Sequence, residues 1–245
     1  MSTKHVFDDA TGLVEKACLG VASTNPDLRF FAHHKVLYNA AHPRDKVAIL
    51  AGGGAGHEPA FSGLVGSGLV TVAVSGDVFA SPSSKQICSG VDLAPTDKGI
   101  VTIVLNYTGD CLNFGLASEK ARSAFHSEGK GRDIEMVNVG DDVSVGRSKG
   151  GLVGRRGLTG AAFTAKVLGA ASEKGDDVQK IAHLGRTMVK NFVTVGSSLD
   201  HCHVPGRSTD PKERGALSQS AVEIGMGIHN EPGAKPVSYT HLRAH

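Results

Sequence analysis

Strand-like and helix-like segments alternate along this 245-residue chain, and the alternation constrains the fold more than any other feature of the sequence. Three segments, 111–125, 159–174 and 177–192, carry apolar residues at helical spacing with charged residues opposite. Four short apolar runs have the length and the β-branched content of buried strands: KVAIL (46–50), LVTVAV (69–74), GIVTIVL (99–105) and IEMVNV (134–139). Because such alternation is typical of parallel sheets, the sequence predicts an α/β fold, with a mostly parallel sheet and helices on both of its faces.

A change in composition near Asn191 predicts a domain boundary. Beyond it the chain becomes rich in loop-forming residues through 196–215. We therefore expect residues 1–191 to form the α/β part and residues 192–245 to form an incomplete second α/β domain.

Composition narrows the class of ligand and the cellular compartment. The 26 basic residues nearly balance the 24 acidic ones, which argues against a surface for nucleic acid or for an anionic membrane. No apolar run has the length of a membrane helix, and the N-terminus lacks the apolar core of a signal peptide. Four widely spaced cysteines without a CxxC pair fit a reducing compartment. We expect a cytoplasmic protein that binds a small molecule.

Each predicted strand runs directly into a polar turn that contains glycine. These turns read AGGGAGHEP, SGDVFASP, NYTGD and GDD, in chain order. Ligands of open α/β sheets bind outside the carboxyl ends of the strands. Because parallel strands end at the same edge, the sequence predicts a ligand site at this edge, lined by all four turns.

The first of these turns does not match a nucleotide-binding loop. GGGAGHEP contains neither GxxxxGK[ST] nor GxGxxG, since His57 occupies the position of the last glycine in the second pattern. The backbone amides of Gly53 and Gly54 can still donate hydrogen bonds to a small polar ligand, as in a glycine turn that precedes a helix. The alternative is a tight strand-to-helix turn in which His57 only caps or packs.

His229 stands among glycines in the run GMGIHNEPG (225–233). Glycines permit unusual backbone angles and the close approach of another group, and Pro232 restricts the chain just beyond. An imidazole in this setting can act as a nucleophile, a base or a ligand.

Other candidate residues favour structural roles. The HCH run at 201–203 offers two imidazoles and a thiol, but a metal site needs three or four converging ligands, so we predict no metal site. We expect Asp141 and Asp142 to lie in a solvated turn, and Cys111, at a predicted helix start, to be buried. The remaining histidines, including those at 33 and 34, are expected at the surface.

Taken together, the motifs resemble one family. The chain contains GGGAGHEPAFSGLVGSG, GDVFASPSSKQI, NYTGDCLNFGLASEKAR, VGDDVSVGRSKGGLVGRRGLTG, VTVGSSLDHCHVPGR and EIGMGIHNEPG. In order and spacing they look like the substrate-binding K domain of dihydroxyacetone kinases, over roughly residues 1 to 235. The uninterrupted VGSSLDHCHVPGR is more similar to the single-chain, ATP-dependent eukaryotic type than to the bacterial phosphotransferase-system type.

The resemblance implies roles for five residues. In this family the histidine of GIHNEPG, here His229, adds to the ketone of dihydroxyacetone and holds it as a covalent hemiaminal. The resemblance places Gly53 and Gly54 against the substrate. It places His57 and Asp110 at the hydroxyl that becomes phosphorylated, where either residue can accept its proton.

The resemblance also implies cofactors and partners. Relatives bind ATP and Mg in a separate helical L domain, which we expect to be missing here, so that this chain binds no cofactor itself. A homodimer is expected. Some eukaryotic relatives also phosphorylate glyceraldehyde or cleave FAD to cyclic FMN, and the sequence does not choose among these activities.

Three departures from the family pattern accompany the resemblance. Leu105 stands before NYTGD where many relatives have lysine, and Ala55 replaces a common serine. From about residue 239 the tail is unlike the family, and we expect the chain to be a fragment. The alternative function is a non-catalytic carbonyl-binding or regulatory protein of the same fold.

Overall fold

The computed structural model describes residues 6, 7, 9–129, 131–145, 154–204, 206 and 217–238. Its centre is a six-stranded sheet in the order β1-β2-β4-β3-β5-β6. The strands of this sheet are β1 (Leu28–Phe31), β2 (Val36–Asn39), β3 (Ala48–Ala55), β4 (Val72–Val78), β5 (Ile100–Leu105) and β6 (Ile134–Val139).

The four predicted strands form the parallel part of this sheet. β3 pairs in parallel with both β4 and β5, and β5 pairs in parallel with β6. β1 and β2, which the sequence analysis did not predict, extend the sheet as antiparallel strands beyond β4. Each has only four residues, too few to show a clear period. The prediction of a mostly parallel α/β sheet is confirmed.

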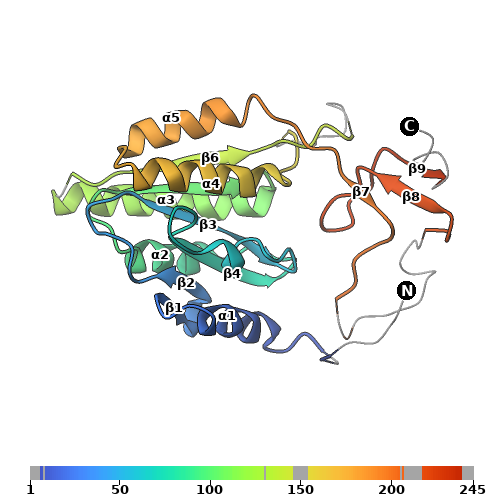
Figure 1. Cartoon of the computed structure of the whole chain (residues 1–245), viewed down its shortest axis with the longest axis horizontal. Helices are drawn as coiled ribbons and strands as arrows, with labels where there is room; N and C mark the ends of the chain where they lie inside the picture. Colours follow the sequence, from blue (N-terminus) through green and yellow to red (C-terminus); the bar gives the residue numbers. More distant parts are fainter. Residues whose placement is uncertain are drawn as a thin grey trace.

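Helices cover both faces of the sheet (Figure 1). Successive residues of β3 point to opposite faces, so Ile49 packs with α4 and α5, whereas Leu50 packs with α2 and α3. α1 contacts β1 at one edge. The helices are α1 (Leu13–Ser23), α2 (Ser84–Leu93), α3 (Thr108–Glu128), α4 (Gly160–Glu173) and α5 (Val178–Met188), with the short 3₁₀ helices η1 (Ala32–His34) and η2 (Ser62–Leu64).

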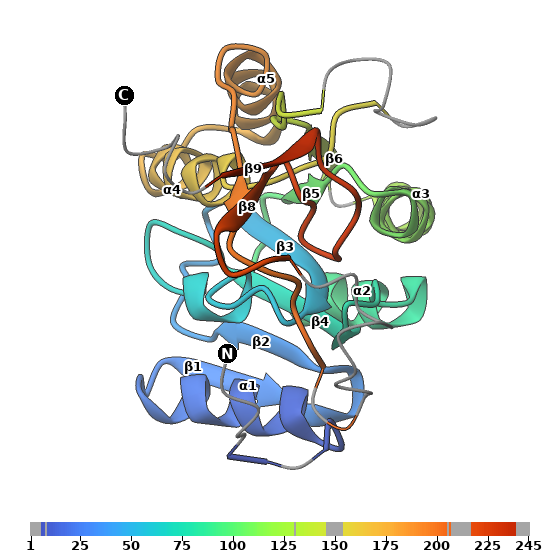
Figure 2. The same cartoon turned by 90° about the vertical axis from the view of Figure 1, so that its right-hand side faces the viewer.

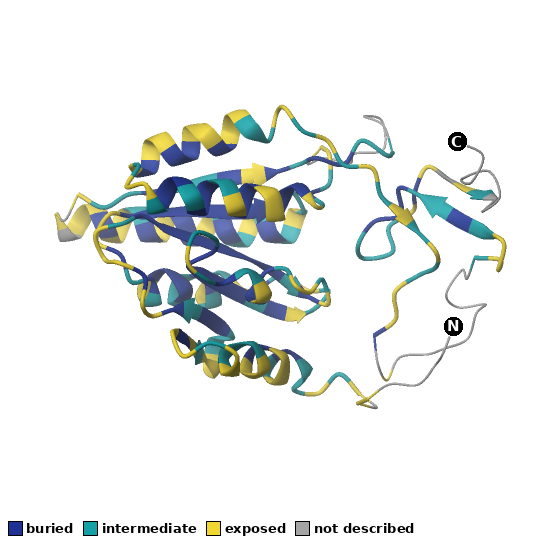
Figure 3. Ribbon diagram, viewed as in Figure 1, coloured by how far each residue is buried: buried dark blue, intermediate teal, exposed yellow. Residues whose placement is uncertain are grey.

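Burial follows this layered arrangement (Figure 3). Residues of β5 are buried along its whole length, because helices lie on both of its faces. The helices are buried on the side that faces the sheet. None of the helices in the described part of the chain is long and apolar enough to span a bilayer.

The expectation of a glycine turn leading into a helix is wrong. β3 continues through all three glycines to Ala55, and the next element is η2, not an α-helix. A Cβ at Gly52 would lie 2.3 Å from the carbonyl oxygen of Val74 and 3.0 Å from the ring of Phe114. Gly52 therefore permits close packing of β4 and α3 against the end of β3.

A three-stranded antiparallel sheet lies at the carboxyl-end edge of the parallel strands (Figures 1 and 2). It is formed by β7 (Ser197–Ser198), β8 (Ala221–Ile224) and β9 (Lys235–Ser238). The described residues after 191 contain no helix. The domain boundary near Asn191 stays a prediction, and the tail from residue 239 lies outside the described residues.

Candidate functional site

A small cavity at the carboxyl ends of β3 and β5 brings the predicted site residues together. It has room for at most one water molecule. All five residues that the sequence analysis selected line it: Gly53, Gly54, His57, Asp110 and His229. Ala60, Phe61, Leu105, Tyr107 and Ile228 complete the wall. The prediction that GGGAGHEP and NYTGD share one edge of the sheet is confirmed.

His229 enters this cavity from the turn after β8 and contacts His57. The two Nε2 atoms are 3.1 Å apart, and the rings meet edge to face with their centroids 4.8 Å apart. Because one nitrogen must donate and the other accept, the two imidazoles have complementary protonation states at these atoms.

Glu231 determines which nitrogen of His229 carries the proton. Its Oε1 lies 2.9 Å from His229 Nδ1, and its Oε2 accepts a hydrogen bond of 3.0 Å from the His229 backbone nitrogen. Burial acts to raise the pKa of Glu231, but these hydrogen bonds outweigh it and lower the pKa to about 2. The ionised carboxylate accepts from Nδ1–H, so a neutral His229 has its lone pair on Nε2, directed at His57.

His57 is held as a neutral donor. Burial, followed by the neighbouring imidazole of His229, lowers its pKa to about 4. Its ring stacks on Phe79 with centroids 5.2 Å apart and 17° between the planes. Phe79 follows β4, so residues from the ends of β3 and β4 fix the position of His57. Its Nε2–H is the donor that faces the lone pair of His229.

Asp110 lies in the first turn of α3 and is 4% exposed. Burial raises the pKa of its carboxyl group, partly offset by a hydrogen bond from Ser81 and by His229. Its Oδ1 is buried and has no hydrogen-bond partner in the described structure. A Cβ on Gly53 would lie 3.8 Å from this carboxylate, so the glycine leaves the approach to Asp110 open.

Tyr107 supplies a second buried polar atom without a partner. Its hydroxyl oxygen lies inside the protein and makes no hydrogen bond within the described residues. The ring of Tyr107 meets that of His229 edge to face, with centroids 4.9 Å apart. Burial, and then the charge of Glu231, raise the pKa of the phenol, which therefore stays protonated.

Arg156 ties the His229 turn to the parallel sheet. Its Nε donates to Asp142 Oδ2 over 2.8 Å, and its Nη2 donates to the carbonyl oxygen of Gly225 over 2.5 Å. Asn230, at φ +64, anchors the other side of the turn. Its side chain accepts from Cys202 N at 2.8 Å and donates to Cys202 O at 2.9 Å.

Several structural expectations need correction. Asp141 and Asp142 do not lie in a solvated turn, because both are buried and act as hydrogen-bond acceptors for the backbone. His42 is buried and not at the surface. Cys111 is only half-buried, and burial raises the pKa of its thiol.

The HCH run does not gather further ligands in the described structure. No group of three or more His, Cys, Asp or Glu side chains that could hold a metal ion occurs among the residues described. Cys202 instead pairs through its backbone with Asn230.

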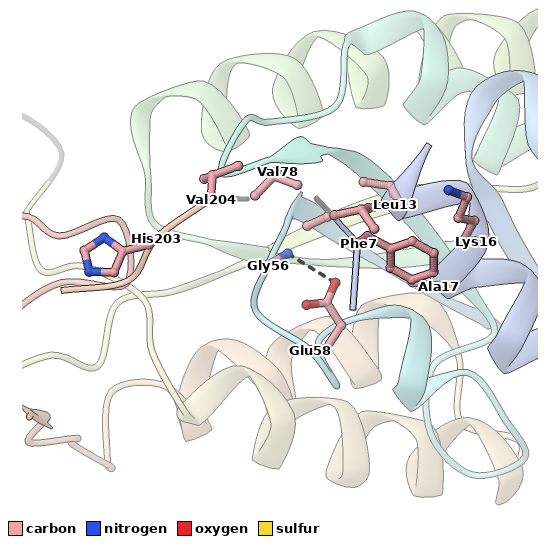
Figure 4. A pocket seen from close by; sticks show the side chains of 11 residues that line it. Phe7, Leu13, Lys16, Ala17, Gly56, Glu58, Val78, His203 and Val204 are labelled. Carbon is pink, nitrogen blue, oxygen red and sulfur yellow. Dashed lines mark hydrogen bonds between the residues drawn. The ribbon is translucent and has the colours of Figure 1, made fainter. Parts of the chain in front are cut away.

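Two wider cavities lie nearby. One of about 510 Å³ lies between α1 and the ends of β3 and β4 (Figure 4). Its wall is mainly apolar, and the carboxylate of Glu58 is turned to the backbone nitrogen of Gly56. A cavity of about 410 Å³ shares His57, Leu105 and Ile228 with the small cavity. The second therefore offers space directly beside the histidine pair.

Sequence reasoning assigned no role to four residues of this site. Three of them belong to motifs that the sequence analysis quoted: Tyr107 to NYTGD, Phe79 to GDVFASPSSKQI and Glu231 to GIHNEPG. The motifs therefore indicated that these residues lie near the site. Arg156 stands in the fourth motif. Their contacts depend on pairings between distant parts of the chain, which no local pattern reveals.

Comparison with known proteins gives consistent matches. The model of the Dak1 domain matches residues 19–244, past residue 239, where we expected the likeness to end. A dihydroxyacetone kinase from Pichia angusta is 45% identical over 248 residues, covering 97% of this chain and 40% of that protein. The triokinase/FMN cyclase of Homo sapiens is 37% identical over 241 residues, with 97% and 40% covered.

A solved structure has the same fold. The dihydroxyacetone kinase from C. freundii, in complex with AMP-PNP and Mg2+, superposes with a TM-score of 0.84 at 33% identity, covering 96% of this chain and 42% of that one. The chain thus spans about 40% of the length of the curated relatives it matches.

Proposed function

Because the chain belongs to the Dak1 domain family, we propose that it is the dihydroxyacetone-binding part of an ATP-dependent dihydroxyacetone kinase. In this proposal His229 captures the ketone as a hemiaminal, and the whole enzyme then phosphorylates a hydroxyl group of the substrate. The observation that carries the proposal is the position of His229, whose Nδ1 is hydrogen-bonded to Glu231 and whose Nε2 faces the cavity.

The capture step uses the lone pair on Nε2 of His229. This pair forms a bond to the carbonyl carbon while the π pair of the C=O bond moves to the oxygen. The oxygen takes up one proton from solvent, and the positive charge that arises on the imidazole is matched by Glu231, which can accept the Nδ1 proton. Glycerol has no carbonyl group and cannot form this adduct.

Capture requires the two imidazoles to separate. The Nε2 atom of His57 is hydrogen-bonded to Nε2 of His229 over 3.1 Å, and the small cavity has too little room for a three-carbon substrate. The adjoining cavity of about 410 Å³ has space for the substrate. We infer that the substrate displaces the His57–His229 hydrogen bond and that the freed Nε2–H of His57 then bonds to a substrate oxygen.

Asp110 and His57 serve the hydroxyl group that is phosphorylated. Asp110 presents an unpartnered carboxylate oxygen to the cavity and can accept the proton, whereas the Nε2–H of neutral His57 orients the same hydroxyl group as a hydrogen-bond donor. Phosphoryl transfer demands mainly positioning and electrostatic stabilisation, which fits a site of this kind. Gly53 and Gly54 lie at the same wall of the cavity and permit close approach.

ATP and Mg belong to another part of the enzyme in this proposal. The described residues contain no cluster of carboxylates suited to Mg, and the sequence contains no Walker-type phosphate loop. A cytoplasmic location and a homodimer complete the proposal. The regulatory alternative is not favoured, because the curated relatives reported above are named as a kinase and a triokinase.

Mass spectrometry of the protein with dihydroxyacetone tests the capture step. With rapid digestion and analysis at low temperature, we expect one substrate mass on the peptide that contains His229. His229→Ala should lose the adduct completely and keep the fold, as judged by circular dichroism. His126→Ala, which changes an exposed histidine at the end of α3, is the matched control and should retain the adduct. An adduct that maps to another residue would refute the proposal.

A further inference from the structure

Two buried polar atoms of the small cavity lack hydrogen-bond partners, and they have complementary chemistry. The hydroxyl oxygen of Tyr107 and Oδ1 of Asp110 are both enclosed and unpaired within the described structure. A buried polar group that stays unpaired costs free energy, so each such atom in a native protein requires an explanation. Here both atoms belong to residues that line one cavity, which points to a shared ligand.

The two groups differ in what they offer to that ligand. Asp110 presents an acceptor when it is ionised, whereas the phenol of Tyr107 presents a donor. Burial raises the pKa of Tyr107, so the phenol keeps its donor proton at neutral pH. A ligand that carries one hydroxyl group and one carbonyl oxygen satisfies both atoms at once.

Among the residues that line the cavity, Tyr107 and His57 have the side chains that can donate a hydrogen bond to a carbonyl oxygen. Apart from Asp110 and His229, the remaining wall is apolar or glycine, including Leu105 at the end of β5. Tyr107 also contacts the nucleophile, since its ring meets that of His229 edge to face at 4.9 Å. The ring of Tyr107 therefore lies beside the imidazole that is proposed to bond to the carbonyl carbon.

We propose that Tyr107 is a catalytic residue whose hydroxyl donates a hydrogen bond to the carbonyl oxygen that His229 converts into the hemiaminal oxygen. The inference rests on the capture step proposed above and adds a residue to it. As the Nε2–C bond forms, negative charge develops on the oxygen, and a fixed donor in a buried cavity stabilises that charge. The hydroxyl group of the same substrate donates to Asp110.

Tyr107→Phe tests this role because it removes one oxygen atom and leaves the ring that packs on His229. We expect the rate of adduct formation with dihydroxyacetone to fall about 100-fold, and the fraction of adduct at equilibrium to fall less, about 3- to 10-fold. The thermal unfolding midpoint should stay unchanged or rise slightly, because the oxygen that is removed has no partner in the unliganded protein. Tyr38→Phe, at a partly buried tyrosine of β2, is the matched control and should leave capture unchanged.

The readouts separate this inference from the capture proposal. If the wild-type protein forms the adduct on His229 and Tyr107→Phe forms it at the same rate, Tyr107 has no catalytic role while capture stands. If Tyr107→Phe slows capture and also lowers the unfolding midpoint substantially, the hydroxyl group has a structural partner, and the inference is wrong. If the wild-type protein forms no adduct at His229, capture and the role of Tyr107 fail together.

Discussion

At the scale of single residues, Glu231 accepts hydrogen bonds from two atoms of His229 through two different oxygens. Oε1 faces Nδ1 at 2.9 Å, and Oε2 accepts from the backbone nitrogen at 3.0 Å. Only a carboxylate offers two acceptors in this geometry. A glutamine side chain has only one acceptor oxygen. In one orientation its amide nitrogen points at the backbone N–H of His229. In the other its amide nitrogen points at Nδ1, and the imidazole proton moves to Nε2.

We therefore predict that Glu231→Gln slows capture of dihydroxyacetone by about 100-fold, because one orientation of the amide moves the imidazole proton to Nε2 and the other sets an N–H group against the backbone N–H of His229. Nitrogen NMR of histidine-labelled protein should show the change of tautomer at His229 before substrate is added. Glu58→Gln, which alters an exposed acid bonded to a single backbone nitrogen, is the control. Unchanged tautomer and capture in Glu231→Gln would remove Glu231 from the mechanism.

For Asp110, the proposed role in the site conflicts with the stability of the folded chain. Burial raises the pKa of its carboxyl group in the folded protein, so folding favours the protonated form. The stability that this group contributes is present below its ordinary pKa of 3.8 and is lost as the pH rises through the raised value. Above the raised pKa the buried, ionised carboxylate lowers the stability of the fold, a cost that fits the role proposed for Asp110 in the site.

We predict that Asp110→Asn raises the thermal unfolding midpoint at pH 7. The increase should shrink as the pH falls toward 3.8, where the wild-type carboxyl group is protonated too. Calorimetry at several pH values checks this dependence. A lower midpoint at pH 7, or a difference that does not vary with pH, would contradict the assignment. In an intact kinase the same substitution should lower kcat more than substrate affinity.

At the scale of elements, α4 begins at a buried carboxylate supplied by another segment. Asp141, which follows β6, accepts from the backbone nitrogens of Leu158 at 2.7 Å and Gly160 at 2.8 Å, and from the hydroxyl group of Thr194. Thr159, the residue before the helix, provides no side-chain cap. The helix start and the segment that leads to β7 are therefore held by one residue at the edge of the sheet.

We predict that Asp141→Ala lowers the free energy of unfolding by about 3 kcal/mol or more, since three donors lose a buried acceptor. Asp177→Ala is the matched control, because Asp177 caps α5 from an exposed position through one hydrogen bond to Lys180 N. That change should cost only about 1 kcal/mol. Urea unfolding of both variants makes the comparison, and equal losses would show that burial of Asp141 adds nothing.

At the scale of the whole molecule, the site joins two parts of the chain. The ends of β3 and β5 supply His57, Tyr107 and Asp110, whereas the turn after β8 supplies His229 and Glu231. Arg156 spans the junction through Asp142 and the carbonyl oxygen of Gly225. The proposed capture of the substrate requires both parts and no nucleotide.

We predict that the purified chain captures dihydroxyacetone and consumes no ATP in the presence of Mg. The described residues hold no carboxylate cluster for a metal ion, and in-line phosphoryl transfer requires a positioned nucleotide. An ADP-release assay on the chain, repeated with a separately produced nucleotide-binding domain of a related kinase, makes the test. ATP consumption should appear only in the second mixture. Turnover by the chain alone would place a nucleotide site among residues that we interpret as turns.

Local patterns in the sequence were sufficient for the central elements and for the edge that carries the site. Period and composition predicted β3 to β6 and α3 to α5, because helices and buried strands leave a signature within a few residues. The four polar turns then predicted one shared edge. The glycines of β3 were misread, because their role is to admit neighbouring chain segments and not to bend the strand.

Tertiary structure alone decided how the site works. The hydrogen bond between His57 and His229 joins residues 172 positions apart, and the burial of Asp141 and Asp142 results from segments that pack over them. Protonation states follow from the same packing, since burial and neighbouring charge set the pKa values of His57 and Glu231. A linear pattern singled out His229 as the proposed nucleophile, but its tautomer and the direction of its Nε2 lone pair depend on contacts that exist only in the folded chain.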